Sequence, residues 1–152
     1  MLFDKAGSAD AALIRGGFDL EPLALGVDDP LARTAAEYAT LVATSLFVPQ
    51  VARLLGVDES RVRQRLAQRT PYGINLPDGL HLPAFQFDEG HLIPGIEQIV
   101  PALDPALHPV AIYRWFTLPH PDLLIGEMPV SPRDWLRSGG SAAEVAALAA
   151  DL

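Results

Sequence analysis

Arginine side chains gather in one short stretch of an otherwise acidic chain. Residues 47–69 hold five arginines against two acids and carry +3, whereas residues 1–46 carry −4 and residues 70–152 carry −7. The five are Arg53, Arg61, Arg63, Arg65 and Arg69. A guanidinium donates hydrogen bonds to phosphates and to base edges, so this positive island predicts binding of a polyanion. The alternative is a solvated helix face that carries arginines without a ligand.

The arginines fall on a segment whose spacing is typical of a helix-turn-helix. We predict one helix over residues 47–55 that ends at Gly56, and a second over residues 59–68 with Asp58 as its N-cap. A small residue is expected where the helices cross, and apolar ones in the turn and on the inner face. These are Ala52, Val57, Val62 and Leu66.

The second helix of this motif would present polar side chains outward. They are Ser60, Arg61, Gln64, Arg65 and Gln68, while Arg53, Arg63 and Arg69 could contact the nucleic-acid backbone at the rim. We therefore expect double-stranded DNA as the partner, with this helix in the major groove. The overall charge of −8 does not oppose this, because the relevant field acts within a Debye length of about 8–10 Å.

Composition and motifs argue against other classes of protein. The chain of 152 residues is 49% apolar and has no cysteine, which excludes disulfides, a thiol nucleophile and a Cys-ligated metal. The four histidines stand at no metal-ligand spacing, and no nucleophile elbow or phosphate-binding glycine loop occurs. We expect no catalytic residue, no metal and no cofactor. Without a membrane-spanning run or a secretory signal, we expect a cytoplasmic protein with no membrane contact.

The remaining pattern predicts a mainly α protein with a small β-hairpin. A helix over about 30–45 begins at Asp29-Pro30, and the hairpin of residues 72–87 turns at Pro77-Asp78-Gly79. Pro83 indicates that the second strand is an edge strand or is interrupted. We expect a flexible tail over residues 1–28, the helix-turn-helix with its hairpin over 29–90, and a helical domain over 91–152.

Within the C-terminal domain we predict four helices. They cover about 94–103, a segment from His108-Pro109, a short one capped by Ser131, and a last one from Ser141, which forms a capping box with Glu144. The prolines and Gly126 between the second and third of these helices indicate a loop. The last helix is rich in alanine, so we expect it to be little buried and to be dispensable for folding.

The last forty residues resemble the toxin-binding domain of Xre/MbcA/ParS-type antitoxins. The matching positions are Trp115, Pro121-Asp122, Ile125, Gly126, Pro129, Trp135-Leu136, Gly139, Val145 and Leu148. Asp122 stands where asparagine is usual, and Ile125 where leucine is usual. The resemblance implies an antitoxin that represses its own operon and neutralises a RES-domain toxin that degrades NAD. The NAD chemistry would belong to the toxin.

Apolar anchors in this acidic region suit a protein–protein surface. We expect the partner contacts at Trp115, Leu124, Met128, Trp135, Glu144, Val145 and Leu148. The alternative is that these residues form the core of a small domain. For function, the alternative is a stand-alone regulator of transcription whose C-terminal domain only dimerises. In either case we expect a homo-oligomer.

Overall fold

The structure is a computed structural model that describes residues 29–152. The expected tail of residues 1–28 lies outside the described residues. Contacts divide the chain into Met1–Ala39 and Thr40–Leu152, and helix α1 (Pro30–Ala43) crosses the boundary. The predicted cap of α1 is confirmed, because Asp29 Oδ1 accepts hydrogen bonds from the backbone N–H of Leu31 at 2.8 Å and Ala32 at 3.2 Å.

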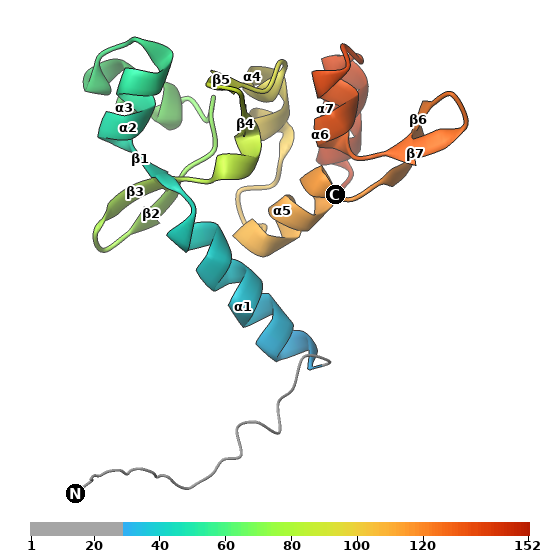
Figure 1. Cartoon of the computed structure of the whole chain (residues 1–152), viewed down its shortest axis with the longest axis horizontal. Helices are drawn as coiled ribbons and strands as arrows, with labels where there is room; N and C mark the ends of the chain where they lie inside the picture. The colour runs from blue at the N-terminus through green and yellow to red at the C-terminus, as the bar shows by residue number, and fades with distance from the viewer. Residues whose placement is uncertain (1–28) are drawn as a thin grey trace, which may run out of the picture. The chain divides into compact units, whose positions relative to one another are not determined.

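A small antiparallel sheet follows α1, and a pair of helices lies between its first and second strands in the sequence. In chain order the elements are β1 (Leu46–Phe47), α2 (Val48–Leu55), α3 (Glu59–Ala67), β2 (Ile74–Leu76) and β3 (Gly79–Leu82) (Figure 1). The strand order is β1-β3-β2, with Leu82 opposite Leu46 and His81 opposite Ile74. Strand β3 is therefore central rather than an edge, and it ends immediately before Pro83, which has no N–H to donate.

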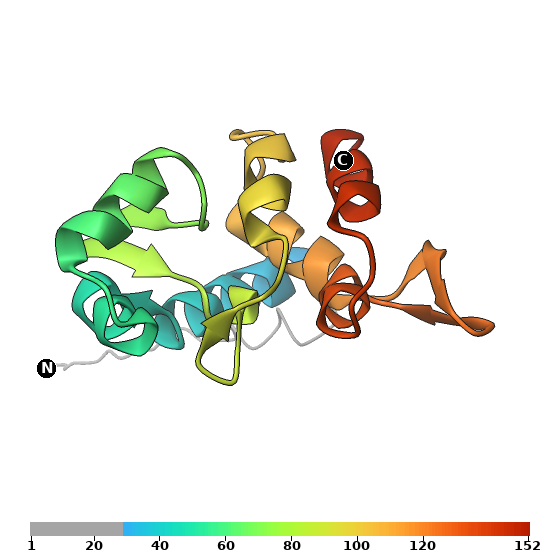
Figure 2. The ribbon, with the colours of Figure 1, turned by 90° about the horizontal axis from the view of Figure 1, so that it is seen from above.

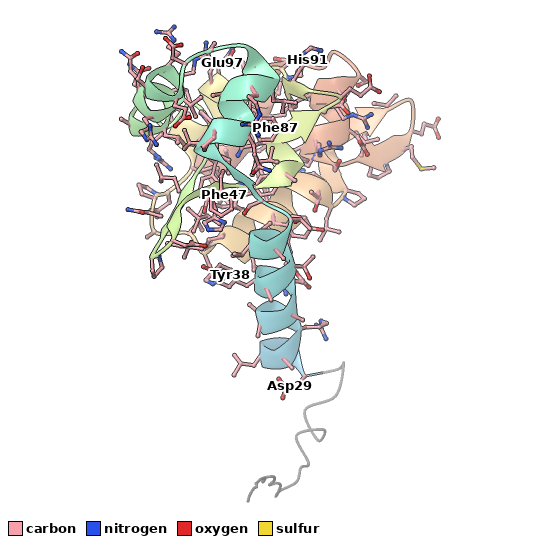
Figure 3. All side chains as sticks on the ribbon, turned by 60° about the vertical axis from the view of Figure 1, so that its left-hand side comes forward. Asp29, Tyr38, Phe47, Phe87, His91 and Glu97 are labelled. Carbon is pink, nitrogen blue, oxygen red and sulfur yellow. The ribbon has the colours of Figure 1, made fainter. Side chains whose placement is uncertain are left out.

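Helices α2 and α3 pack on this sheet around a first hydrophobic core. Its buried members are Val48, Val51, Ala52, Val62, Leu82 and Phe87. Phe87 lies beside α2 (Figure 3), so a residue well beyond the hairpin completes the core under the helix pair. The helix-turn-helix thus forms one layer, which packs on the layer formed by the strands.

The chain then builds a second group of elements. They are a 3-10 turn (Ala84–Gln86), β4 (Phe87–Asp88), β5 (His91–Leu92), α4 (Ile96–Ile99), a 3-10 turn (Val100–Ala102), α5 (Pro109–Thr117), β6 (His120–Ile125), β7 (Met128–Val130), α6 (Pro132–Arg137) and α7 (Ala142–Ala150). A second core of eleven buried residues, among them Ile99, Phe116, Leu123 and Val145, lies between these helices. Among residues 29–152, none of the helices combines the length and apolar character that crossing a bilayer requires.

The mainly α fold with a small hairpin is confirmed, and the structure adds short strands that the sequence did not indicate: β1, the pair β4–β5 and the pair β6–β7. The segment expected to be a loop after α5 is the hairpin β6–β7, which extends away from the helices (Figure 2). Leu123 is buried while Leu124 and Ile125 are exposed, so Leu123 is the one residue of β6 that is buried in the core. Pro121 and Pro129 are tolerated because each strand has a single partner and needs only part of its N–H groups.

The predicted helix caps meet different outcomes. Ser131 Oγ accepts from the N–H of Asp134 at 3.0 Å, as expected, and Ser141 Oγ accepts from the N–H of Glu144 at 3.4 Å, which is one of the two hydrogen bonds of the predicted capping box. The prediction that the Asp58 side chain caps α3 is wrong, because Asp58 occupies the N-cap position without a side-chain hydrogen bond to the helix.

The expectation that the last helix is little buried is also wrong. In α7, Val145 has no exposed surface and Ala149 is buried with it in the second core. A close approach brings this helix onto the start of α4: a Cβ on Gly95, whose φ is +90°, would lie 2.5 Å from Ala142 Cβ. Only glycine gives both that backbone angle and that spacing, so α7 is an integral part of the fold.

A buried amide joins the two groups of elements. The Gln86 side chain is completely buried; its Oε1 accepts from the N–H of Tyr72 at 2.9 Å, and its Nε2 donates to the C=O of Tyr72 at 2.7 Å. The same Nε2 lies 3.2 Å from the C=O of Pro83. The amide therefore acts as a short strand that fixes the segment after α3 against the segment after β3.

Arginines of α6 strengthen this junction. Arg133 donates to the C=O of Phe85 at 2.8 Å and to the C=O of Phe87 at 2.7 Å. Arg137 pairs with Asp88 at 3.0 Å and with Asp134 at 3.2 Å, and hydrogen bonding to Asp88 raises the pKa of the guanidinium. Helix α6 is thereby bound to the strand that also carries Phe87 of the first core.

Replacing Gln86 tests this junction. Gln86→Leu keeps a similar volume but removes the bonds to the backbone of Tyr72 and Pro83 in a buried place. We expect the free energy of unfolding to fall by about 2–4 kcal/mol. Chemical denaturation measures this, with Gln98→Leu at an exposed position as the control, expected within about 0.5 kcal/mol of the wild type. Equal stability of the two variants would contradict the role given to the amide.

Truncating α7 tests the corrected position of that helix. Val145→Ala removes two buried methyl groups and should cost about 2 kcal/mol, whereas Ala147→Ser on the exposed side of α7 should be nearly neutral. Deletion of residues 141–152 should lower the melting temperature far more than Val145→Ala. A truncated chain that melts at the wild-type temperature would show that α7 only rests on the surface.

Candidate nucleic-acid interface

A tight turn sets the angle between α2 and α3. Gly56 ends α2 in the left-handed conformation, with φ +68°, and the N–H of Val57 donates to the C=O of Ala52 at 3.0 Å. Ala52 is buried where the helices meet, and Val57 packs against the first core. The turn chemistry predicted from the sequence is therefore confirmed, and it fixes the direction in which α3 leaves the body of the protein.

Helix α3 is held by one face and exposes the other. Val62 is 1% exposed and Leu66 is half-buried against the same core. Four of the predicted contact residues are exposed and come from the opposite positions of the helix and its C-terminal end. They are Ser60, Arg61, Gln64 and Gln68. The Arg61 guanidinium bonds the Gln64 amide oxygen at 3.3 Å, so two donors of this face already lie side by side.

The remaining arginines of the positive island take different positions. Arg53 is exposed at the end of α2, and Arg63 is exposed and pairs with Glu59 at 3.6 Å. Arg65 is half-buried. Arg69 is turned away from the others, because one of its guanidinium nitrogens donates to the C=O of Leu103 at 3.1 Å. The island is therefore spread over one helix face, its rim and an inward-facing end.

The hairpin β2–β3 stands beside α3 as a wing. A groove of about 320 Å³ separates the two, with Arg63 on the helix side and Asn75 and Asp78 on the hairpin side. The order helix, turn, helix, then a hairpin that pairs with a strand preceding the first helix, is that of a winged helix-turn-helix. The sequence indicated both parts, but it did not indicate that strand β1 pairs with β3.

A chain of hydrogen bonds anchors the wing. His81 is 4% exposed; its Nε2 lies 2.7 Å from Asp78 Oδ1 and its Nδ1 lies 2.7 Å from Ser45 Oγ. Ser45 Oγ in turn donates to the C=O of Val42 at 2.6 Å. The sequence of groups carboxylate, imidazole and hydroxyl is that of a hydrolase triad, but the hydroxyl is bonded to a helix carbonyl and the ring is enclosed. We therefore infer that these hydrogen bonds hold the turn of the wing in position.

The predicted partner residues of the C-terminal part are divided between core and surface. Val145 is fully buried and cannot contact a partner in this structure, and Leu148, Trp115 and Trp135 are half-buried against the second core. The Trp135 indole also covers Gly140 and donates to the C=O of Ser141 at 3.2 Å. Leu124, Met128 and Glu144 are exposed, the first two on the β6–β7 hairpin.

Metal ligands do not converge in the described part of the chain. Within residues 29–152, no three His, Cys, Asp or Glu side chains come together as a group that could hold a metal ion. A cavity that the sequence did not signal lies beside Arg69 and Tyr72, behind α3. Its walls come from residues far apart in the chain, so no local pattern could have predicted it.

Comparison with solved structures shows what the fold is similar to. No protein-family model matches the chain, and no curated protein sequence matches it. Among solved structures, it is similar to the NMR structure of Rv2175c, with 28% sequence identity and a TM-score of 0.52. The match covers 70% of this chain and 79% of that chain. Over most of its length the chain thus has the fold of that protein.

Proposed function

We propose that this protein binds double-stranded DNA through its winged helix-turn-helix and regulates transcription. The observation that carries the proposal is the exposed face of α3, where Ser60, Arg61, Gln64 and Gln68 stand on a helix fixed from behind by Val62. Hydroxyl, amide and guanidinium groups are those that read base edges in the major groove. A helix of this size, held by one face only, can enter that groove with its other face.

Electrostatics supports the same orientation. The exposed cations Arg53 and Arg63 flank the face, one at the end of α2 and one toward the wing, where phosphates would pass on either side of the groove. Acidic side chains dominate the rest of the chain, so the island is the place where the approach of DNA is favoured. Arg69 is not included in this proposed interface, because it is bound within the protein.

The proposal includes a homo-oligomer. One short recognition helix and one wing make few phosphate contacts, and regulators of this kind gain affinity and specificity by binding two half-sites as a dimer. The expected readout is an operator with two-fold symmetry and half-sites about one helical turn, or about 34–36 Å, apart.

Removing the arginines of α3 tests DNA binding. With a duplex from the region upstream of its own gene, Arg61→Ala together with Arg65→Ala should weaken binding by about 1–3 kcal/mol, or about 5- to 150-fold, if either side chain reads a base edge. A gel shift at fixed salt measures this. The matched control is Gln98→Glu with Ala111→Glu, two exposed positions outside α3 and the wing. It lowers the net charge by the same two units and should bind nearly as the wild type does. Equal affinity of the arginine variant and this control would exclude α3 as the recognition helix.

A second candidate function is that of an antitoxin for a RES-domain toxin. Apart from the resemblance of the C-terminal residues, the observation that favours it is the exposed apolar surface of the β6–β7 hairpin, where Met128 is 68% exposed and Leu124 and Ile125 are nearly half exposed. Such side chains on a hairpin that extends from the body suit contact with another protein. The competing reading is that this surface joins two copies of a regulator.

Charged substitutions on the hairpin distinguish the two readings. Leu124→Asp with Met128→Asp should leave the fold intact, since both side chains are exposed, but should abolish an apolar contact. If the chain is an antitoxin, cells that co-express it with a RES-domain toxin encoded beside it should keep their NAD with the wild type and lose it with the variant. Gln98→Glu with Ala111→Glu serves again as the charge-matched control. If NAD falls with the wild type as well, the antitoxin function is wrong. If the variant becomes monomeric but still protects NAD, the hairpin joins copies of this chain.

A further inference from the structure

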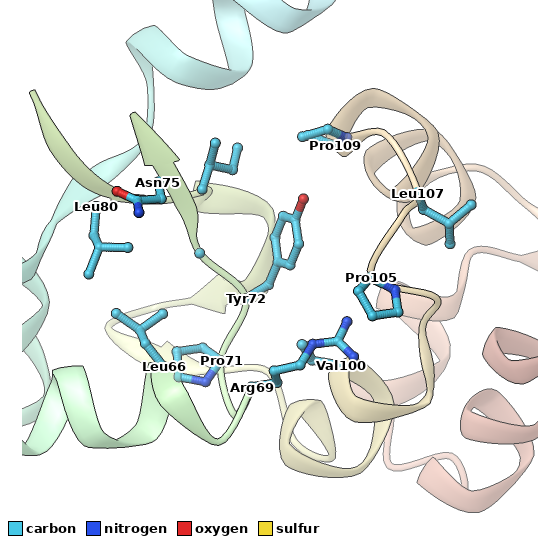
Figure 4. A pocket seen from close by; sticks show the side chains of 12 residues that line it. Leu66, Arg69, Pro71, Tyr72, Asn75, Leu80, Val100, Pro105, Leu107 and Pro109 are labelled. Atoms are coloured by element: carbon cyan, nitrogen blue, oxygen red, sulfur yellow. The ribbon is translucent and has the colours of Figure 1, made fainter. Parts of the chain in front are cut away.

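A cavity lies between the helix-turn-helix and the segment that precedes α5. It measures about 350 Å³, and Figure 4 shows its two walls facing each other. One wall comes from the end of α3 and the hairpin, with Leu66 and Leu80; the other comes from the second part of the chain, with Val100 and Leu107. This volume lies at the small end of the range for ligand pockets, so it suits a molecule with one ring.

Arg69 is the one charged residue among those that line this cavity, and most of the other lining side chains are apolar. Arg69 is half-buried there, and no acidic residue is among those that line the space. One guanidinium nitrogen donates to the C=O of Leu103, which fixes the group, and in the described part of the chain its other N–H donors have no further protein acceptor. A fixed guanidinium without a counter-charge, next to apolar walls, recognises a carboxylate better than any neutral group.

Arg69 has an uncommon backbone conformation at the end of α3. Its φ is +56°, which is unfavourable for a residue with a long side chain and is more easily adopted by asparagine or glycine. The conformation directs the side chain inward rather than along the outer face of α3. This conformation ends α3 in a Schellman motif, in which the N–H of Arg69 donates to the C=O of Leu66 at 2.9 Å and the N–H of Thr70 donates to the C=O of Arg65 at 2.9 Å.

An aromatic side chain, that of Tyr72, also lines the cavity. The Tyr72 ring stands in the cavity between the hairpin and the prolines Pro105 and Pro109 (Figure 4). Its backbone is fixed on both sides of the peptide by the buried Gln86 amide, so the ring has a firm base. Flat apolar surfaces of this kind pack well against the faces of another ring.

We propose that this cavity binds a small aromatic carboxylic acid, with the carboxylate on Arg69 and the ring between Tyr72 and Leu107. Leu66, Asn75 and Leu80 of the lining belong to α3 and the wing, so a bound acid also contacts the two elements of the proposed DNA surface. That coupling rests on the proposed function, whereas binding of the acid does not.

Titration of the ¹⁵N-labelled full chain with salicylate, without DNA, tests the proposal by NMR. We expect saturable shifts of amides around the cavity, such as those of Gly73, Val100 and Leu107, and at least tenfold weaker binding of salicylamide, which has the same ring but no charge. Shifts that do not saturate, or equal affinity for the two probes, would overturn the proposal. Because no DNA is present, failure here leaves the proposed DNA binding untouched, and failure of the gel shift leaves this result untouched.

Two variants assign the binding to this cavity. Arg69→Asn removes the charge and tolerates the positive φ, so the chain should stay folded and bind salicylate no better than salicylamide. Leu107→Trp fills the cavity from the opposite wall while keeping Arg69, and should abolish binding of both probes. Arg53→Asn, which removes an exposed arginine at the end of α2 and outside the cavity, should bind salicylate as the wild type does. Unchanged salicylate binding by Leu107→Trp, or an unchanged preference for the anion in folded Arg69→Asn, would place the binding elsewhere and contradict the proposal.

Discussion

The two cores of this protein depend on one fully buried amide between them. Gln86 satisfies the backbone of Tyr72 at the exit from α3 and the C=O of Pro83 at the exit from β3, and its own backbone C=O accepts from Ile93 at 2.8 Å. Burial of a polar group is tolerated only when its hydrogen bonds are made, and here they are. Because each of these segments lies next to a different core, one side chain sets the geometry of both.

This constraint connects the proposed DNA surface with the cavity behind it. Gln86 fixes Tyr72, which lies only three residues after Arg69. The short stretch from the end of α3 to Tyr72 therefore carries both the inward-facing guanidinium and the tyrosine ring. Helix α3 is thus restrained at its start by the Gly56 turn and at its end by this segment. The wing is restrained separately, through the hydrogen bonds of His81 to Asp78 and Ser45. A recognition helix and a wing that are each held by their own contacts can keep a fixed spacing, and recognition of a DNA groove requires such a spacing.

In the C-terminal part, some apolar side chains are buried in the second core and others are exposed. Helix α7 completes the second core through Val145 and Ala149, whereas the hairpin that precedes α6 leaves Leu124, Ile125 and Met128 in solvent. An interaction surface is therefore expected on the hairpin rather than on the last helix. Arg133 and Arg137 connect α6 to the strand of Phe87, so a partner on that hairpin would contact a rigid body and not a loosely attached tail.

Local chemistry by itself determined much of this protein. Asp29-Pro30, Gly56, Ser131 and Ser141 mark helix boundaries because caps and left-handed turns depend on neighbouring residues alone, and the outward face of α3 follows from the spacing of Val62 and Leu66. Other features depend on residues distant in sequence, which no local pattern encodes. The pairing of β1 with β3, the burial of Val145 against α4, and the turning of Arg69 toward Leu103 needed the packed structure. The β6–β7 hairpin was hidden for a related reason: its prolines indicate a loop unless one knows that each strand has only one partner.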